Sequence, residues 1–247
     1  MKNRQVLLIN RPTEVAQADD FKIVETDPDP LPQGSFRVVN HFLSVDPAMR
    51  GWIADEGNYA SPVPLGSVMR SLAAGEVVES KHPDFAVGTL LSGWFGWQEQ
   101  CVVTPDAVVR RITEADLPLS LSLGILGING VTAHLALTTI GQPIAGETVL
   151  VSTAAGAVGS AVGQIANLLG CRTIGVAGGK RKCNLCVDEF GFAAAIDYKQ
   201  PDLEYAIRAV SPAGVDVYFD NAGGETLATV LRQLALGARV VLCGMIE

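Results

Sequence analysis

Apolar residues follow a short, turn-broken pattern in the first half of the chain. Runs of apolar or alternating residues are separated by clusters of Pro, Gly and Asp, which is typical of β-strands joined by turns. These runs cover residues 6–10, 21–26, 36–45, 73–80 and 99–104. The pattern predicts a mostly β domain over residues 1–125.

The pattern changes at Ser120, where a long apolar segment begins. Residues 121–141 are compatible with a helix, and Gly141 followed by Pro143 is a plausible helix stop. We therefore expect a helix at the start of a second domain, over residues 126–247.

Strand and helix patterns then alternate with short connections. The expected strands are residues 147–153, 172–177, 194–198, 215–221 and 238–244. The expected helices are residues 157–170, 180–191, 202–210 and 224–237. Such alternation is typical of an α/β fold with a doubly wound parallel sheet. Because a complete sheet of this kind has one strand more, we expect it to be C-terminally incomplete.

Composition is that of an ordinary globular protein. Of the 247 residues, 48% are hydrophobic and 18% are charged, and this length suits two modest domains. A net charge of −8 offers no basic surface to a nucleic acid, so we expect no such partner. No apolar run has the length of a membrane span or a signal peptide. We therefore expect a cytoplasmic protein without a membrane partner.

The five cysteines are an odd and scattered set, which is unlike a disulfide framework. Cys183 and Cys186 have the spacing of half a metal knuckle or of a redox pair. No second pair lies at zinc-finger distance, and the motif falls in an expected helix. We interpret these cysteines as incidental, with metal or redox chemistry as the alternative.

A glycine-containing turn joins the strand at 147–153 to the helix that follows. It reads Ala154-Ala155-Gly156-Ala157-Val158-Gly159, with alanine in place of the first glycine of the G-x-G-x-x-G pattern. Gly156 allows the backbone to approach a pyrophosphate, and Gly159 allows the helix to pack close to the strand. Free N–H groups at the helix start can then hold the phosphates. The context favours a Rossmann-type dinucleotide site over a ligand-free, small-residue helix.

The end of the next strand indicates which dinucleotide is bound. NAD-selective sites usually carry Asp or Glu there, whereas this chain has Gly178-Gly179 followed by the cations Lys180, Arg181 and Lys182. An acid would repel a 2′-phosphate, while a glycine pair leaves room for it and a lysine attracts it. The residues favour NADP(H), and a solvated basic helix start is the alternative.

Several motifs in order resemble the zinc-free branch of the medium-chain dehydrogenase/reductases, which contains prostaglandin reductases, leukotriene hydroxydehydrogenases, alkenal double-bond reductases and curcumin reductases. The similarity covers nearly the whole chain, through LSVDPAMRG, GWFGWQEQCVV, VSTAAGAVGSAVGQIA, GVAGGKRKC, AAIDYK and VDVYFDNAGGE. It implies a GroES-like, mostly β substrate domain followed by a Rossmann domain that binds NADP(H). It also implies a homodimer.

The resemblance further implies roles for individual residues. Lys182 matches a lysine that binds the 2′-phosphate, Tyr198 matches the tyrosine beside it, and Asn221 matches an asparagine that contacts the cofactor. The remaining expected cofactor residues are those of the pyrophosphate turn and of the loop under the nicotinamide: Gly156, Ala157, Val158, Gly159, Ser160, Cys243, Gly244, Met245 and Ile246.

A zinc site is not expected. Zinc-dependent relatives need a cysteine where this chain has Leu43, and a Gly-His-Glu where it has Gly66-Ser67-Val68. The histidines share no metal-ligand spacing, and each is interpreted as a packing or surface residue: His41, His82 and His134.

Without a metal, hydride can still add to an alkene that is conjugated with a carbonyl, provided that a hydrogen bond reaches the carbonyl oxygen. Tyrosines serve this purpose in the resembling enzymes, but this chain has Ala48 in place of one of them. Tyr59 is the remaining tyrosine of the first domain and the one catalytic candidate. Arg50 could orient a substrate carbonyl or form a structural ion pair, and we favour the ion pair. One or two of Trp52, Trp94 and Trp97 could line an apolar pocket.

The sequence therefore predicts an NADPH-dependent reductase of enones or enals that works without zinc. A quinone reductase of the same superfamily and a non-catalytic NADPH-binding protein are the alternatives. Because the expected sixth strand lies beyond Glu247, we expect either a piece of a longer protein or a natural short form.

Overall fold

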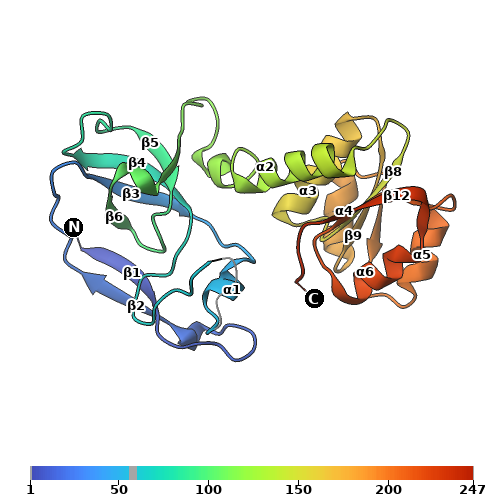
Figure 1. The fold of residues 1–247 in the computed structure, drawn as a ribbon, viewed down its shortest axis with the longest axis horizontal. Helices are drawn as coiled ribbons and strands as arrows, with labels where there is room; N and C mark the ends of the chain where they lie inside the picture. Colours follow the sequence, from blue (N-terminus) through green and yellow to red (C-terminus); the bar gives the residue numbers. More distant parts are fainter. Residues whose placement is uncertain (1, 56–59, 247) are drawn as a thin grey trace. The chain divides into compact units, whose positions relative to one another are not determined.

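In the computed structural model, which describes residues 2–55 and 60–246, the chain forms two units, Met1–Leu123 and Gly124–Glu247 (Figure 1). In the described part of the first unit the strands are β1 (Asn3–Leu8), β2 (Phe21–Thr26), β3 (Phe36–Leu43), β4 (Ala73–Ser80), β5 (Leu90–Gly93), β6 (Gln100–Val103) and β7 (Val108–Arg111). A short helix, α1 (Met49–Trp52), and 3-10 turns at Ala18–Asp20, Pro105–Ala107 and Leu119–Leu123 complete it.

The first unit is built on an antiparallel sheet. Its strand order is β6-β3-β4-β5-β7, and β1 and β2 pair with each other as a separate antiparallel ribbon. Alternate residues of β3 point to the same face, so Phe36 and Val38 are both fully buried. The ring of Phe36 stacks on that of Phe85 with centroids 4.3 Å apart. The mostly β domain is therefore observed.

Two of the three four-residue strands of this unit, β5 and β7, are not predicted by the sequence patterns, because strands of this length contain few positions for an alternation to stand out. The third, β6, falls within the expected run at 99–104. The expected strand at 36–45 ends at Leu43, where the Ser44 hydroxyl turns to the carboxylate of Asp46 at 2.8 Å.

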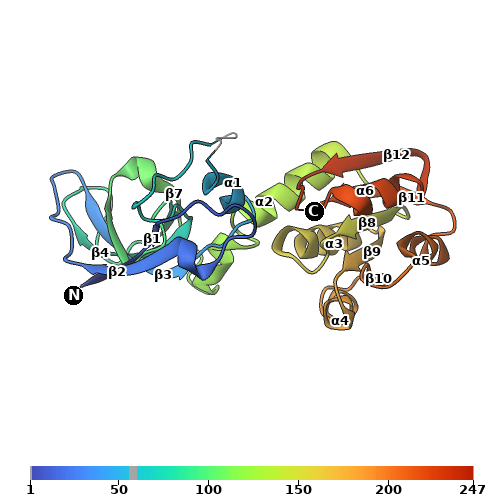
Figure 2. The same cartoon turned by 90° about the horizontal axis from the view of Figure 1, so that it is seen from below.

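The second unit contains a fully parallel sheet. Its strands are β8 (Thr148–Ser152), β9 (Arg172–Ala177), β10 (Ala194–Asp197), β11 (Val215–Asp220) and β12 (Leu234–Leu242). Its helices are α2 (Ile128–Leu135), which continues as a π-helix over Ala136–Gly141, α3 (Ala157–Leu168), α4 (Lys180–Asp188), α5 (Leu203–Val210) and α6 (Gly224–Leu231). The strand order is β10-β9-β8-β11-β12. Figure 2 shows α4 and β12 at opposite ends of this sheet.

Helices cover both faces of the parallel sheet. Val149 and Val151 of β8 belong to a buried cluster with α2, α3 and α4, whereas Leu150 belongs to a cluster with α5 and α6. Neighbouring residues of one strand thus pack into different cores, as a doubly wound sheet requires. The Rossmann-type fold predicted from the alternating pattern is confirmed.

Two expected helices differ from the observed ones by more than three residues at one end. The segment expected as one helix over 121–141 is a 3-10 turn followed by α2, which begins at Ile128, beyond Gly124 and Gly127. The helix expected over 224–237 ends at Leu231, and Leu234 already pairs with Val215 as the start of β12. Strand pairing has outweighed the helix-forming residues at 231–236.

Arg239 of β12 ties together segments that are distant in sequence. Its guanidinium forms a two-pronged ion pair with Glu147, with N–O distances of 2.9 and 2.6 Å. The same group donates to the carbonyls of Gly141 and Gln142 at 3.0 and 2.9 Å, at the end of the π-helix. A single side chain thereby satisfies helix-end carbonyls and joins them to the edge strand.

All five cysteines are free thiols. Burial raises the pKa of Cys186 to about 11, and burial also raises the pKa of Cys183. Both groups are therefore thiols near neutral pH, which is unlike a reactive redox pair. None of the helices in the described part of the chain has the length and apolar character of a membrane span.

Candidate functional site

The carboxyl ends of the five parallel strands lie at one edge of the second unit, and the expected cofactor residues follow them. A cavity of about 140 Å³ opens at this edge. Its lining residues lie at the ends of β8 and β9, in the segments that follow β8, β10, β11 and β12, and in α6: Ser152, Thr153, Val176, Tyr198, Ala222, Thr226 and Ile246. In doubly wound sheets this edge is where ligands bind.

The glycine turn brings α3 very close to β8. A Cβ atom on Gly159 would lie 2.3 Å from the backbone oxygen of Thr153, so a larger residue would push the helix away. Thr153 itself has a φ of 52°, in the left-handed region, and its oxygen accepts the Gly156 N–H at 2.8 Å. The sequence pattern identified the glycines but not Thr153, whose backbone forms the other side of the same turn.

The first turn of α3 offers N–H groups to a ligand. Gly156 is the N-cap, and within the described residues no side chain caps this helix start. The first N–H groups of a helix have no acceptor inside the helix, and the dipole makes this end attractive to anions. Ala157, Val158, Gly159 and Ser160 occupy this turn, as expected.

The segments after β9 and β10 meet at a glycine pair. The position of a Cβ atom on Gly178 would lie 3.0 Å from the Tyr198 hydroxyl oxygen, so this ring covers the glycine. Gly179 has a φ of 89°, which favours glycine, and its N–H donates to the Asp197 carboxylate at 2.7 Å. Lys182 is exposed in the first turn of α4 directly after this pair.

A buried carboxylate organises the segment after β11. Asp220 is fully buried and its Oδ1 accepts the hydroxyls of Ser152 and Tyr218, at 2.9 and 2.5 Å. The same oxygen accepts the N–H groups of Ala222 and Gly223, both at 3.1 Å. These donors satisfy the hydrogen-bonding capacity of a carboxylate that would otherwise be costly to bury.

Asn221 is held by β8. Its N–H donates to the Ser152 hydroxyl and its Nδ2 donates to the Ser152 carbonyl, both at 2.8 Å. One hydrogen of the Asn221 side-chain amide is thus used inside the protein. The side-chain oxygen, Oδ1, accepts no hydrogen bond from the described residues. The structure brings Asn221 to the expected edge and gives it a structural contact that the sequence did not indicate.

The segment after β12 folds back over the end of β11. Cys243 and Gly244 donate their N–H groups to the Asp220 carbonyl at 2.8 and 3.1 Å, and Ile246 donates to the Ala222 carbonyl at 2.8 Å. Ile246 lines the cavity and Met245 is 86% exposed. The expected nicotinamide loop therefore lies beside Asn221, joined to it through the backbone of Asp220.

The candidate residues of the first unit occupy other positions. Tyr59 lies outside the described residues. Ala48 precedes α1, and Arg50 is exposed on it. Trp52 is buried in a cluster against which Trp97 packs.

The third tryptophan, Trp94, is 44% exposed. Its ring packs edge-on against that of Trp52, with the ring centroids 5.8 Å apart. Trp97 donates its Nε1 hydrogen to the Ser44 carbonyl at 3.0 Å. Two of the three tryptophans are thus mainly packing residues.

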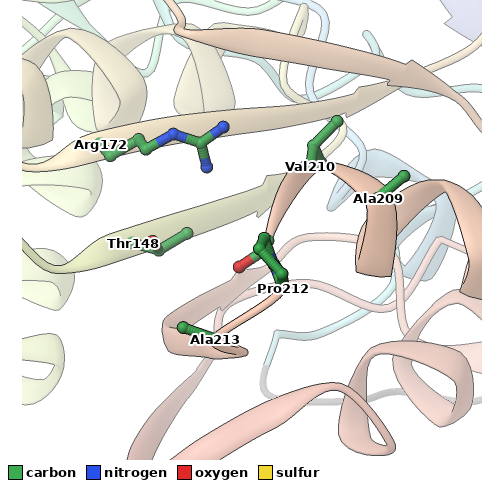
Figure 3. A pocket seen from close by; sticks show the side chains of 7 residues that line it. Thr148, Arg172, Ala209, Val210, Pro212 and Ala213 are labelled. Carbon is green, nitrogen blue, oxygen red and sulfur yellow. The ribbon is translucent and has the colours of Figure 1, made fainter.

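A larger cavity, of about 520 Å³, lies at the opposite edge of the parallel sheet. It is lined by the first residues of two strands, Thr148 and Arg172, and by the turn after α5. Figure 3 shows Arg172 and Thr148 on neighbouring strands, facing Val210 and Pro212. None of the expected cofactor residues lines it, so its size does not make it the candidate site.

Comparisons with known proteins match this geometry. Residues 4–110 match the N-terminal domain of oxidoreductase family, and residues 157–247 match the family described as zinc-binding dehydrogenase. The chain is 38% identical to the NADPH-dependent curcumin reductase of Escherichia coli, over 100% of this chain and 71% of the relative. It is 41% identical to the NADP(+)-dependent 2-alkenal reductase of Nicotiana tabacum, over 100% of this chain and 74% of that protein.

The chain belongs to the zinc-free medium-chain dehydrogenase/reductases. The crystal structure of CurA from Vibrio vulnificus in complex with NADPH is similar, with a TM-score of 0.92 and 38% identity over 98% of this chain and 72% of that one. Although one matched family is described as zinc-binding, Leu43 and Ser67 stand where zinc ligands would be required. In the parts of the chain that the structure describes, no three His, Cys, Asp or Glu side chains gather to hold a metal ion.

The site fits the dinucleotide that this reductase family uses. The close approach at Gly159 and the uncapped first turn of α3 leave backbone N–H groups facing the strand edge, as a pyrophosphate requires. The uncovered side of Gly179, with no atom within 4 Å of its Cβ position, leaves room near Lys182 for an additional phosphate. The sequence did not predict the residues that hold these loops in place: Ser152, Thr153, Asp197 and Asp220. A sequence pattern does not reveal which groups from distant segments will form hydrogen bonds.

Proposed function

We propose that the chain uses NADPH to reduce the carbon–carbon double bond of α,β-unsaturated ketones or aldehydes. The observation that carries the proposal is the glycine turn opening onto the strand edge next to Gly178, Gly179 and Lys182. Support comes from relatives that share the family and are named as NADPH-dependent curcumin and 2-alkenal reductases.

The overall reaction adds a hydride and a proton across the alkene: enone, NADPH and a proton give the saturated ketone and NADP⁺. The cofactor supplies the hydride when it is bound. The chain positions it, with the first turn of α3, from Ala157 to Ser160, at the pyrophosphate and Lys182 and Tyr198 at the 2′-phosphate. The Ser160 N–H donates to the Gly156 carbonyl at 2.9 Å, so the N–H groups offered to the pyrophosphate are those that precede it. Asn221 and the loop from Cys243 to Ile246 orient the nicotinamide end.

Alkene reduction suits a site without zinc ligands. Hydride addition places negative charge on the carbonyl oxygen of the enone, and one or two hydrogen bonds stabilise that charge. Tyr59 or a water molecule, together with a ribose hydroxyl, is the proposed donor. The zinc-dependent relatives, by contrast, use the metal as a Lewis acid, for which this chain lacks the soft or imidazole ligands at the corresponding positions.

The proposal also covers the roles of the two domains, the cellular compartment and the oligomeric state. Residues 1–125 form the substrate domain and residues 126–247 the NADP(H) domain, in a cytoplasmic homodimer. The homodimer is proposed from the resemblance to the reductase family, and the net charge of −8 means that an interface between copies has to overcome mutual repulsion. Light scattering on a size-exclusion column tests the homodimer.

Decay of NADPH absorbance tests the activity. Purified protein is expected to consume NADPH with a short enone and to produce the saturated ketone, detected by mass spectrometry. Turnover with quinones but not with enones would replace the proposal by a quinone reductase. Tight NADPH binding without any turnover would replace it by a non-catalytic binding protein.

A further inference from the structure

A lysine that the sequence motifs did not single out lies beside the glycine pair. The Cβ position of Gly178 would lie 3.2 Å from Lys199 Cε, next to the contact with the Tyr198 hydroxyl oxygen at 3.0 Å. The Lys199 ammonium is one bond beyond this carbon. The side chain therefore packs over Gly178 beside the Tyr198 hydroxyl.

Asp197 braces the segment that carries this lysine. Its Oδ1 accepts the N–H of Gly179 at 2.7 Å and that of Lys199 at 3.1 Å. The carbonyl of Gly179 in turn accepts the N–H of Lys182 at 3.0 Å. The backbone of Lys182 on α4 is thus linked to that of Lys199 after β10 by three hydrogen bonds, through Gly179 and Asp197.

Both lysines keep their charge available. None of the ion pairs formed among the described residues includes Lys182 or Lys199. The nearby Asp197 carboxylate accepts the N–H groups of Gly179 and Lys199, and these bonds, followed by a smaller effect of the Lys199 charge, lower its pKa. In a chain with a net charge of −8, two lysines outside these ion pairs near one glycine pair supply positive charge there, next to the Asp197 carboxylate.

We propose that Lys199 is a second ligand of the cofactor 2′-phosphate, opposite Lys182, and that Asp197 positions it. A phosphate monoester carries a charge of about −1.5 to −2 near neutral pH, which one lysine only partly balances. Lys199 on one side of the Gly178–Gly179 turn and Lys182 on the other can share this charge, with the Tyr198 hydroxyl between them. This inference rests on the proposed use of NADPH.

Calorimetric binding of NADPH, NADH and 2′,5′-ADP to the full chain tests the role of Lys199. In Lys199→Ala, the affinity for NADPH and 2′,5′-ADP is expected to fall about tenfold or more, with NADH unchanged, because one charged hydrogen bond is lost. Lys199→Gln, which keeps most of the aliphatic stem, is expected to behave like Lys199→Ala. Arg172→Ala, at the opposite edge of the sheet, controls for loss of one positive charge.

The outcomes separate this inference from the proposed function. If the unmodified chain binds neither NADPH nor 2′,5′-ADP, both fail. If it prefers NADPH but Lys199→Ala and Lys199→Gln retain the full preference, the role of Lys199 is overturned and the proposed function stands. An equal loss in Arg172→Ala would also overturn it, since the effect would then be one of general charge.

The positioning role of Asp197 has its own readout. Asp197→Ala leaves the N–H groups of Gly179 and Lys199 without their acceptor, so NADPH affinity is expected to fall while NADH affinity changes less. Asp197→Asn keeps an acceptor oxygen and is expected to retain or raise NADPH affinity, because it removes a negative charge. If both variants raised NADPH affinity, Asp197 would merely repel the phosphate and the positioning role would be wrong.

Discussion

Ser152 donates its hydroxyl hydrogen to the buried carboxylate of Asp220 across 2.9 Å, which joins the ends of β8 and β11. The same hydroxyl oxygen accepts the N–H of Asn221 at 2.8 Å. One serine therefore links the strand that enters the glycine turn to the asparagine expected to contact the cofactor. The Asp220 carbonyl also accepts the N–H groups of Cys243 and Gly244. The sheet edge where the cofactor is expected to bind therefore depends on the contact between Ser152 and Asp220.

The first prediction concerns this link. Ser152→Ala leaves the Asn221 N–H without its acceptor and removes one donor from Asp220, in a fully buried place. The free energy of unfolding is expected to fall by about 1–3 kcal/mol, as measured by urea denaturation. A change within about 0.5 kcal/mol, typical of surface substitutions, would show that the link is dispensable.

A second prediction compares the two glycines of the turn. Gly159→Ala would place Cβ 2.3 Å from the Thr153 oxygen, whereas Gly156→Ala would place it 3.1 Å from the same atom. Forcing α3 away from β8 is expected to cost about 1–3 kcal/mol and to weaken NADPH binding strongly. Gly156→Ala serves as the matched variant and is expected to unfold at nearly the original urea concentration. Equal stability of the two variants would contradict the close approach.

The third prediction concerns Lys182. Its replacement by alanine is expected to reduce NADPH affinity by about 1.5 kcal/mol or more, through loss of a charged hydrogen bond to the 2′-phosphate. NADH affinity should change little, and titration of each cofactor by fluorescence or calorimetry measures both. An equal loss for the two cofactors would refute the phosphate role.

The fourth prediction is a dependence of stability on pH. The hydrogen bond from Arg239 holds the pKa of Glu147 below its ordinary value of 4.5. The ion pair therefore stabilises the fold above pH 4.5 and loses that contribution as the pH falls through the lowered pKa. In Glu147→Gln, unfolding free energies measured over this acidic range should fall less steeply than in the parent chain. Identical slopes would show that Glu147 does not titrate differently in the folded state.

Much of the second unit was predictable because its signals are long and repeated. The residues of β9 matched the expected strand at 172–177, and the glycine turn was placed directly between β8 and α3. Alternation of strand and helix then limits the topology to a few possibilities. The edge that carries Gly156, Tyr198 and Asn221 follows from those rules, whereas the strand order was not predicted and comes from the structure.

The remaining features depend on contacts between distant segments. Leu234 becomes part of a strand through pairing with Val215, which no local pattern at 231–237 reveals. The acceptor roles of Asp197 and Asp220 likewise arise when loops from different strands meet. Thr153, with a positive φ, was unremarkable in the sequence because threonine seldom adopts that conformation.

The position of Arg239 also bears on the order in which the second unit is completed. Its bonds to Gly141 and Gln142 connect residues 98 and 97 positions apart. A nascent chain emerging from the ribosome cannot seal the end of the π-helix until this arginine has left the exit tunnel. The last carbonyls of the helix that begins the unit therefore remain in water until the residues up to Arg239 have been synthesised.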